Sequence, residues 1–112
     1  MPWRLIFFRQ GRGEEPVREF LRALPKAARI EAGAALTDLE RLGPALRRPD
    51  ADFLANGIYE LRFRAVRVEY RILYFFAKDR VVLAHGFIKK SAAVPKSELE
   101  KAVSRREIWR SA

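Results

Sequence analysis

Charged side chains interrupt two neighbouring apolar segments in the middle of this chain. The segments read IYELRFR (58–64) and VEYRILYFF (68–76). Strand side chains alternate between the two faces of a sheet, so the charged residues of these segments are expected to share one face. We call this face the charged platform, and its residues are Glu60, Arg62, Arg64, Glu69 and Arg71.

Arg71 is the platform residue whose chemistry is most constrained. Its neighbours along the segment are mostly aromatic and aliphatic. A guanidinium is costly to bury among such side chains unless it has a partner. Arg71 is therefore expected to face either an anionic ligand or a carboxylate.

The positive charge of the chain is concentrated in its second half. Residues 62–112 contain 13 Lys and Arg against five Asp and Glu, which is +8 of the total net charge of +9. An even distribution would suit a role in solubility alone, whereas this concentration favours a polyanionic partner, with nucleic acid first and an acidic protein second. The length of 112 residues and the apolar fraction of 49% predict one folded domain spanning 1–112.

Composition argues against several classes of site. The chain has no cysteine and a single histidine, His85, so we expect no disulfide framework, no thiolate or histidine-rich zinc site and no cofactor. The apolar run near the N-terminus is broken by arginines and is too short for a signal peptide or a membrane span. The expected location is the cytoplasm, without a membrane partner.

The pattern of apolar residues and breakers predicts an α+β fold. Helical spacing follows Pro16 and again follows Pro25, and Gly43 with Pro44 is a strong stop signal. Short connections between the later strands predict an antiparallel meander. We expect a small, mostly antiparallel sheet with the helices packed on one of its faces. The expected elements, in the order strand-helix-helix-strand-strand-strand-helix, are a strand at 3–8, helices at 16–24 and 25–42, a loop at 44–57, strands at 58–64, 68–76 and 80–89, and a helix after Pro95.

The strand motifs resemble those of a known family. YELRF, YRILYFF and HGFIKKS, followed by a proline-opened helix, are similar to the motifs of the RelE/ParE toxin superfamily, specifically its phage-derived HigB-like branch. The resemblance runs from about Trp3 to Trp109. It implies a RelE-like fold and a single toxin domain over 1–112. The implied activity is that of a type II toxin-antitoxin toxin, a ribosome-dependent mRNA endonuclease that inhibits translation. The implied partners are the 70S ribosome, mRNA and a cognate helix-turn-helix, HigA-like antitoxin that covers the charged platform.

The resemblance also implies catalytic roles on the platform. Metal-independent RNA cleavage uses the 2′-hydroxyl as nucleophile, and it needs a base, cations for the charged transition state and an acid for the leaving oxygen. By their places in the family motifs, Arg71 stabilises the transition state and Arg62 holds phosphate. Glu60 is either the base or an orienting partner of Arg71, and its place between two arginines favours orientation. The alternative for Arg71 is a structural salt bridge with Glu60 or Glu69.

The end of the last strand carries further candidates. Lys89 and Lys90 have opposite parity, so only one of them can point onto the platform, and the strand-end arginine of the family favours Lys90. Histidine titrates near neutrality, but the strand neighbours of His85 favour a hydrogen-bonded packing residue over an acid or base. The general acid stays open. The other residues expected to bind RNA are Arg64, Arg67, Lys96, Arg105, Arg106 and Trp109.

Two other functions fit the same features. A ParE-like inhibitor of DNA gyrase would share the scaffold and need no RNA-cutting residues. A non-catalytic nucleic-acid-binding module would bind RNA without cutting it.

Overall fold

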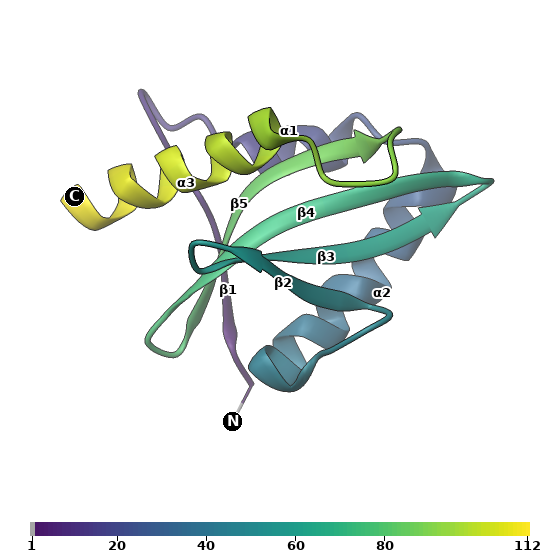
Figure 1. Cartoon of the computed structure of the whole chain (residues 1–112), viewed down its shortest axis with the longest axis horizontal. Coiled ribbons are helices and arrows are strands. Elements are labelled where there is room, and N and C mark those ends of the chain that lie inside the picture. The colour runs from purple at the N-terminus through teal and green to yellow at the C-terminus, as the bar shows by residue number, and fades with distance from the viewer. Residues whose placement is uncertain (1) are drawn as a thin grey trace.

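A computed structural model describes residues 2–112, which form a five-stranded sheet and three α-helices (Figure 1). This confirms the α+β class. Pro16 opens the first helix, and Pro25 and Pro95 immediately precede the other two, at positions where a missing N–H leaves no helical hydrogen bond unmade. The elements are β1 (Arg4–Phe7), α1 (Pro16–Arg22), α2 (Lys26–Leu42), the 3₁₀ helix η1 (Gly43–Ala45), β2 (Ala51–Ala55), β3 (Ile58–Ala65), β4 (Val68–Ala77), β5 (Arg80–Lys89) and α3 (Lys96–Ser111).

The strands are arranged in the order β1-β5-β4-β3-β2. β3, β4 and β5 are consecutive antiparallel neighbours, which confirms the predicted meander. β1 pairs with β5 in parallel, with Phe7 opposite Leu83. The sheet is therefore mostly antiparallel, with β1 and β2 at its edges.

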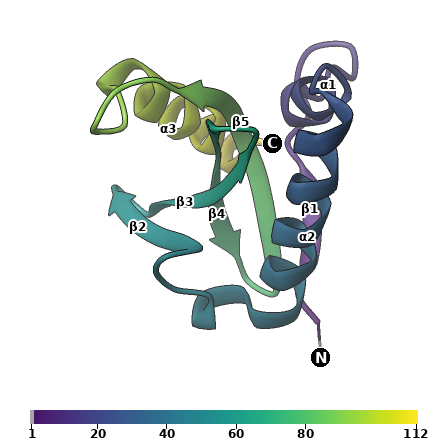
Figure 2. The ribbon, with the colours of Figure 1, turned by 90° about the vertical axis from the view of Figure 1, so that its right-hand side faces the viewer.

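The helices cover both faces of the sheet, so the expectation that they pack on one face is wrong. Figure 2 shows α1 and α2 on one side of the strands and α3 on the other. Ile72 and Tyr74 of β4 pack in a core with Val17 of α1, whereas Leu73 and Phe75 pack in a second core with α3. β4 can be buried on both faces because its apolar residues occur at both parities.

The segment expected to be a loop at 44–57 contains the edge strand β2. β2 pairs antiparallel with β3, and the ladder runs from Ala55 opposite Ile58 to Ala51 opposite Leu61. Pro49 and Asp50 lie just before the strand, and Asn56 and Gly57 form the turn after it. These breakers bound a short strand instead of a continuous loop. Because the ladder stops at Leu61, the second half of β3 has no strand on its outer side among residues 2–112.

β5 contains an irregularity that changes which residues share a face. Leu73 pairs with His85 and the next residue, Tyr74, pairs with Leu83, so Ala84 is an extra residue in the ladder. A bulge of this kind interrupts the strict alternation of side chains. Residues before and after Ala84 therefore follow different parity rules.

Candidate functional site

The strand register brings the charged platform together on the face of the sheet that also carries α3. Directly paired residues on neighbouring strands lie on the same face, so the register defines rows of side chains across the sheet. The three rows are Arg64–Glu69–Lys89, Arg62–Arg71–Phe87 and Asp52–Glu60–Leu73–His85.

Glu60 lies at the centre of the platform. Its Oε1 accepts a hydrogen bond from Arg62 Nε at 2.7 Å, and its Oε2 lies 3.7 Å from Arg71 Nε. Glu60 is only 2% exposed. A buried carboxylate is stable when it is paired, so the two guanidinium groups provide the charge compensation that Glu60 requires. Glu60 in turn fixes where both guanidinium groups lie.

Arg71 is held by protein groups and is 6% exposed. Its Nη1 donates to the carbonyl oxygen of Tyr70 at 2.9 Å and to Glu69 Oε1 at 3.3 Å. Of the two possibilities left open by the sequence, the structure contains the salt bridge, and it involves both Glu60 and Glu69. Glu69 has a side chain that is 41% exposed, so it forms the outer cover of Arg71.

Asp52 and Arg48 extend the platform, and the sequence analysis did not single them out. Asp52 Oδ2 lies 2.8 Å from Arg48 Nε and 3.5 Å from Arg62 Nη2. The hydrogen bond from Arg48 is the largest factor that holds the pKa of Asp52 below its usual value. Asp52 reaches the platform because β2 is a strand that places it opposite Glu60. A loop at 44–57, as expected from the sequence, would not place Asp52 opposite Glu60.

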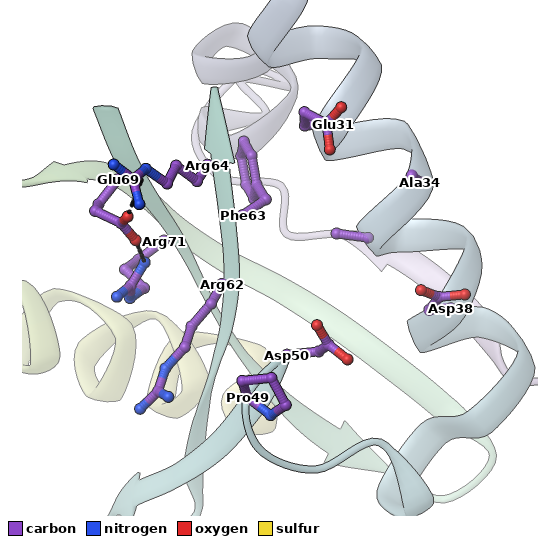
Figure 3. Close-up of a pocket in the computed structure, with 11 residues that line it drawn as sticks. Glu31, Ala34, Asp38, Pro49, Asp50, Arg62, Phe63, Arg64, Glu69 and Arg71 are labelled. Atoms are coloured by element: carbon purple, nitrogen blue, oxygen red, sulfur yellow. Dashed lines mark hydrogen bonds and ion pairs between the residues drawn. The ribbon is translucent and has the colours of Figure 1, made fainter. Parts of the chain in front are cut away.

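An open cleft of about 520 Å³ adjoins the platform at the outer side of β3 (Figure 3). Arg62, Arg64 and Arg71 line it from the sheet. In Figure 3, Glu69 lies between Arg64 and Arg71, and its interactions with both are drawn. Glu31 and Asp38 line the opposite side of the cleft from α2, whereas Asp50 lies next to Arg62, whose backbone N–H donates to the Asp50 carbonyl oxygen (Figure 3). The cleft therefore contains both guanidinium and carboxylate groups.

Lys89 lies on the platform face, because β5 pairs it with Glu69. Its Nζ donates to the carbonyl oxygen of Ala92 at 3.0 Å. Lys90 follows the last residue of β5 and is exposed. The prediction that Lys90 is the lysine on the platform is therefore wrong. The bulge at Ala84 shifts the alternation of side chains in the rest of β5, so Lys89 lies on the platform face instead.

His85 is a buried, hydrogen-bonded residue, as its strand neighbours suggested. It is 8% exposed, and its Nε2 and Nδ1 lie 2.7 Å from Glu98 Oε1 and 3.2 Å from Arg105 Nη1. A guanidinium can only donate, so Nδ1 accepts and Nε2 carries the proton given to Glu98. Burial is the largest influence on the pKa of His85 and lowers it, and the hydrogen bond with Glu98 opposes this effect. His85 thus joins β5 to α3.

The last helix presents fewer cations to solvent than its sequence suggests. Arg105 Nη1 donates to the carbonyl oxygen of Ala84 at 2.8 Å, so this side chain holds the bulge. Burial lowers the pKa of Arg105. Arg106 is buried, in contrast to the exposed surface expected for it. Trp109 packs on Phe75 with ring centroids 6.3 Å apart.

Two expected RNA-binding residues are freely accessible. Lys96 is the first residue of α3, and Arg67 lies in the turn between β3 and β4. Both are exposed. They flank the platform without belonging to its ion-pair network among residues 2–112.

The family of the chain follows from a match that covers most of it. Residues 19–107 match the model of the family described as Phage derived protein Gp49-like (DUF891). The matched segment begins in α1, includes the whole platform and ends in α3. The chain belongs to this family, a toxin-like family related to toxins of the RelE/ParE type. Among curated proteins, none matches the chain.

Residues 2–112 contain neither a candidate membrane span nor a candidate metal site. None of their helices has the length and apolarity that crossing a membrane requires. No group of three or more His, Asp or Glu side chains among them is placed to hold a metal ion.

Proposed function

We propose that this protein is the toxin of a type II toxin-antitoxin system and that it cleaves mRNA on the ribosome. The proposal includes a HigB-like position within the wider superfamily and a RelE-like fold for the single domain 1–112. The observation that supports it most is the arrangement of Arg62 and Arg71 as direct cross-strand partners, with Glu60 between them, beside an open cleft. Membership of a toxin-like family supports the same function.

The proposed reaction needs no metal ion. The 2′-oxygen of the substrate attacks the adjacent phosphorus, a P–O2′ bond forms, and the P–O5′ bond breaks. The products are a 2′,3′-cyclic phosphate and a free 5′-hydroxyl, and the proton lost from the 2′-oxygen is balanced by the one gained at the leaving oxygen. The negative charge of the transition state lies on the phosphoryl oxygens, where guanidinium donors stabilise it.

The exposure of the two arginines suggests their order of contact with phosphate. The Arg62 side chain is 31% exposed and can meet phosphate directly. Arg71 can meet it once Glu69, which also pairs with Arg64, turns its Oε1 away from Arg71 Nη1 toward solvent. The fixed contacts of Arg71 with Glu60 and the Tyr70 carbonyl preorganise its guanidinium, which is the condition for strong transition-state stabilisation.

Glu60 is proposed as the orienting group instead of the general base. Both of its oxygens are near guanidinium groups. Its carboxylate is therefore engaged in holding Arg62 and Arg71 in place. Lys89 is the platform lysine proposed to assist at the phosphate, and Lys90 is proposed to bind RNA beside it. The other proposed RNA contacts are Arg64, Arg67 and Lys96. Arg105, Arg106 and Trp109 are engaged in contacts with the sheet or buried, so they are not proposed to bind RNA.

The proposed partners are the 70S ribosome with its mRNA and a helix-turn-helix, HigA-like antitoxin. The ribosome surface is largely RNA phosphate, so a chain with a net charge of +9 is attracted to it, and more salt weakens this attraction. An antitoxin segment with acidic residues can cover the platform by the same electrostatic attraction.

Induction in a bacterium tests this function. Producing the chain alone should stop growth and translation, and sequencing of mRNA 5′ ends should show new ends that are absent with Arg71→Ala. Coproduction of the helix-turn-helix protein encoded beside the chain should restore growth. Harmless induction at high soluble yield would refute the toxin function.

A gyrase inhibitor on the same scaffold is the second candidate. The observation that favours it is that Arg62, Arg64 and Arg71 each pair with a carboxylate, which reduces the net positive charge offered to RNA. Platform variants separate the two functions. Toxicity that persists when mRNA cleavage is abolished, together with inhibited DNA supercoiling, would establish the gyrase function instead.

A further inference from the structure

A second concave surface is lined by residues of α1, α2 and β1. These two helices lie on the side of the sheet opposite α3 and the charged platform (Figure 2). The volume of this concave surface is about 290 Å³. Its lining is apolar along the middle, formed by Phe7 of β1, Leu21 of α1, and Ala32, Gly33 and Leu36 of α2. We call this surface the α1–α2 groove. Two helices and an edge strand thus leave apolar side chains open to solvent at one place.

Three arginines border the α1–α2 groove. Arg18 lies over the Phe7 ring, 4.2 Å from its centroid, and pairs with Glu15 at 2.7 Å. Arg22 and Arg29 are exposed, and neither forms an ion pair with a carboxylate in residues 2–112. Arg29 Nη1 donates only to the carbonyl oxygens of Arg22 and Leu24, which fixes its direction without neutralising its charge. The rim of the groove is therefore positively charged.

Gly33 is the feature of the groove that the isolated chain does not explain. It lies inside α2, where glycine is less favourable than alanine. A Cβ atom at Gly33 would have no atom within 4 Å, so no packing within the chain requires a glycine there. A glycine on an exposed helix surface allows another backbone to approach closely. Gly33 therefore leaves the backbone of α2 uncovered in the groove, where a backbone from another molecule has room to approach.

We propose that the α1–α2 groove binds an amphipathic helix of a partner protein, with acidic residues on both sides of its apolar stripe. The apolar stripe would contact Phe7, Leu21 and Leu36, and the close approach would occur over Gly33. The carboxylates would pair with Arg22 and Arg29, and a lysine-bearing helix would be repelled. Because the groove faces away from the charged platform, this binding does not depend on the proposed RNA cleavage.

Binding of designed peptides to the full chain tests the proposal without RNA or ribosomes. The probe is a synthetic helical peptide with a leucine stripe bordered by glutamates, and binding is followed by fluorescence anisotropy. One control peptide replaces every glutamate with lysine. A second control has the same composition in a scrambled order that removes the stripe, because a chain this basic attracts any acidic peptide. Only the first peptide should bind tightly.

Variants of the chain locate the binding site. Gly33→Gln places a long neutral side chain over the groove on a good helix former, and it should weaken binding by about tenfold or more. Gly33→Ala should weaken binding less than Gly33→Gln does, since its added methyl group is small. Arg22→Glu with Arg29→Glu should weaken binding by about tenfold, whereas Lys101→Glu with Arg110→Glu, at two exposed positions of α3, makes the same charge change and should not. Thermal unfolding of each variant shows whether it is folded.

Three outcomes would overturn the proposal. Equal binding of the scrambled peptide would mean that only net charge is recognised. Binding lost equally in the α3 double variant and in Arg22→Glu with Arg29→Glu would have the same meaning. Self-association of the chain that Gly33→Gln abolishes would assign the groove to a second copy of the chain.

Discussion

Arg62 and Arg71 lie directly opposite each other on β3 and β4, and both approach the same carboxylate, that of Glu60. Like charges directly opposite each other destabilise a sheet. The arrangement is stable because Glu60 is buried between them and compensates both. The platform therefore contains two cations that one anion holds in fixed positions. The stability of the folded protein depends on Glu60, because without it the two guanidinium groups would repel each other.

Glu60→Gln should destabilise the protein strongly. The substitution keeps the size of the side chain but leaves two guanidinium groups facing each other, one of them buried. Removing one partner of a buried ion pair costs roughly 3 kcal/mol. Urea unfolding measures this loss. Glu69→Gln is the control, because the Glu69 side chain is 41% exposed, far more than that of Glu60, and should contribute less than about 1 kcal/mol. Equal effects of the two variants would mean that Glu60 has no special role.

The platform could be predicted from the sequence because β3 and β4 alternate regularly. Glu60, Arg62 and Arg64 share a face, and so do Glu69 and Arg71, as simple parity predicts. In β4, apolar residues occur at both even and odd positions, which indicates that helices cover both faces of the strand. The expectation of helices on one face only is therefore at odds with the pattern of β4 itself.

Other parts of the site depend on contacts that local sequence does not specify. β2 is short and lies between breakers, so it becomes a strand only by pairing with β3, and Asp52 reaches the platform only through that pairing. The bulge at Ala84 lies at the end of the apolar run 81–84, and the spacing of apolar residues does not reveal the extra residue, although Gly86 is a weak local sign of an irregular strand. The bulge changes the face of every later residue, which is why Lys89 and not Lys90 lies on the platform.

The stability of the protein should fall as the pH falls through the titration range of His85. Burial lowers the pKa of His85 in the folded state. The unfolded state therefore takes up a proton at a higher pH, about 6.5, and is favoured below that value. The melting temperature should decrease between about pH 7.5 and pH 5.5, before most carboxylates titrate.

His85→Gln tests the source of this pH dependence. The chain has no other histidine, so the variant should have a flatter melting temperature over the same pH range. An unchanged pH dependence in the variant would assign the effect to other groups.

Gly86→Ala should separate α1 from the sheet. A Cβ atom at Gly86 would overlap the ring of Phe20, so β5 can approach α1 only with glycine at this position. Overpacking of this kind costs roughly 1–3 kcal/mol. Gly33→Ala is the opposite case, because its Cβ has open space and alanine favours the helix, and it should raise the melting temperature by roughly 4 °C. Thermal unfolding compares the two, and a stabilising Gly86→Ala would contradict the packing described.

Exposed cations near the end of β5 should contribute to RNA binding through charge alone. Lys90→Glu with Lys96→Glu removes two exposed lysines and should reduce the salt dependence of single-stranded RNA binding, with a slope lower by about 1.4 for two lost phosphate contacts. Lys26→Glu with Arg41→Glu makes the same charge change on α2 and is the control. Filter binding at several salt concentrations measures the slopes. Equal slopes for both pairs would mean that no particular surface faces the RNA.

Arg105→Glu with Arg106→Glu is unsuitable for that purpose. Arg105 holds the carbonyl oxygen of Ala84, and Arg106 is buried. We expect this double variant to lose much of its stability, because it buries a new carboxylate without a partner. Its melting temperature, measured beside that of the wild type, tests this expectation, and a fully stable variant would contradict the burial of Arg106.

The cleavage rate of Arg71→Ala on programmed ribosomes tests the central claim most directly. Arg71 is proposed to act where charge develops in the transition state, so its loss should slow single-turnover mRNA cleavage by about a hundred- to a thousandfold and change ribosome binding by only a few-fold. Arg71→Lys should restore little, because an ammonium group cannot reproduce the two-pronged contact. Arg71→Met keeps most of the side-chain volume, and thermal unfolding of all three variants separates loss of chemistry from loss of fold. A folded Arg71 variant that cuts mRNA at nearly the wild-type rate would contradict the account, and reduced cleavage with intact ribosome binding and fold would support it.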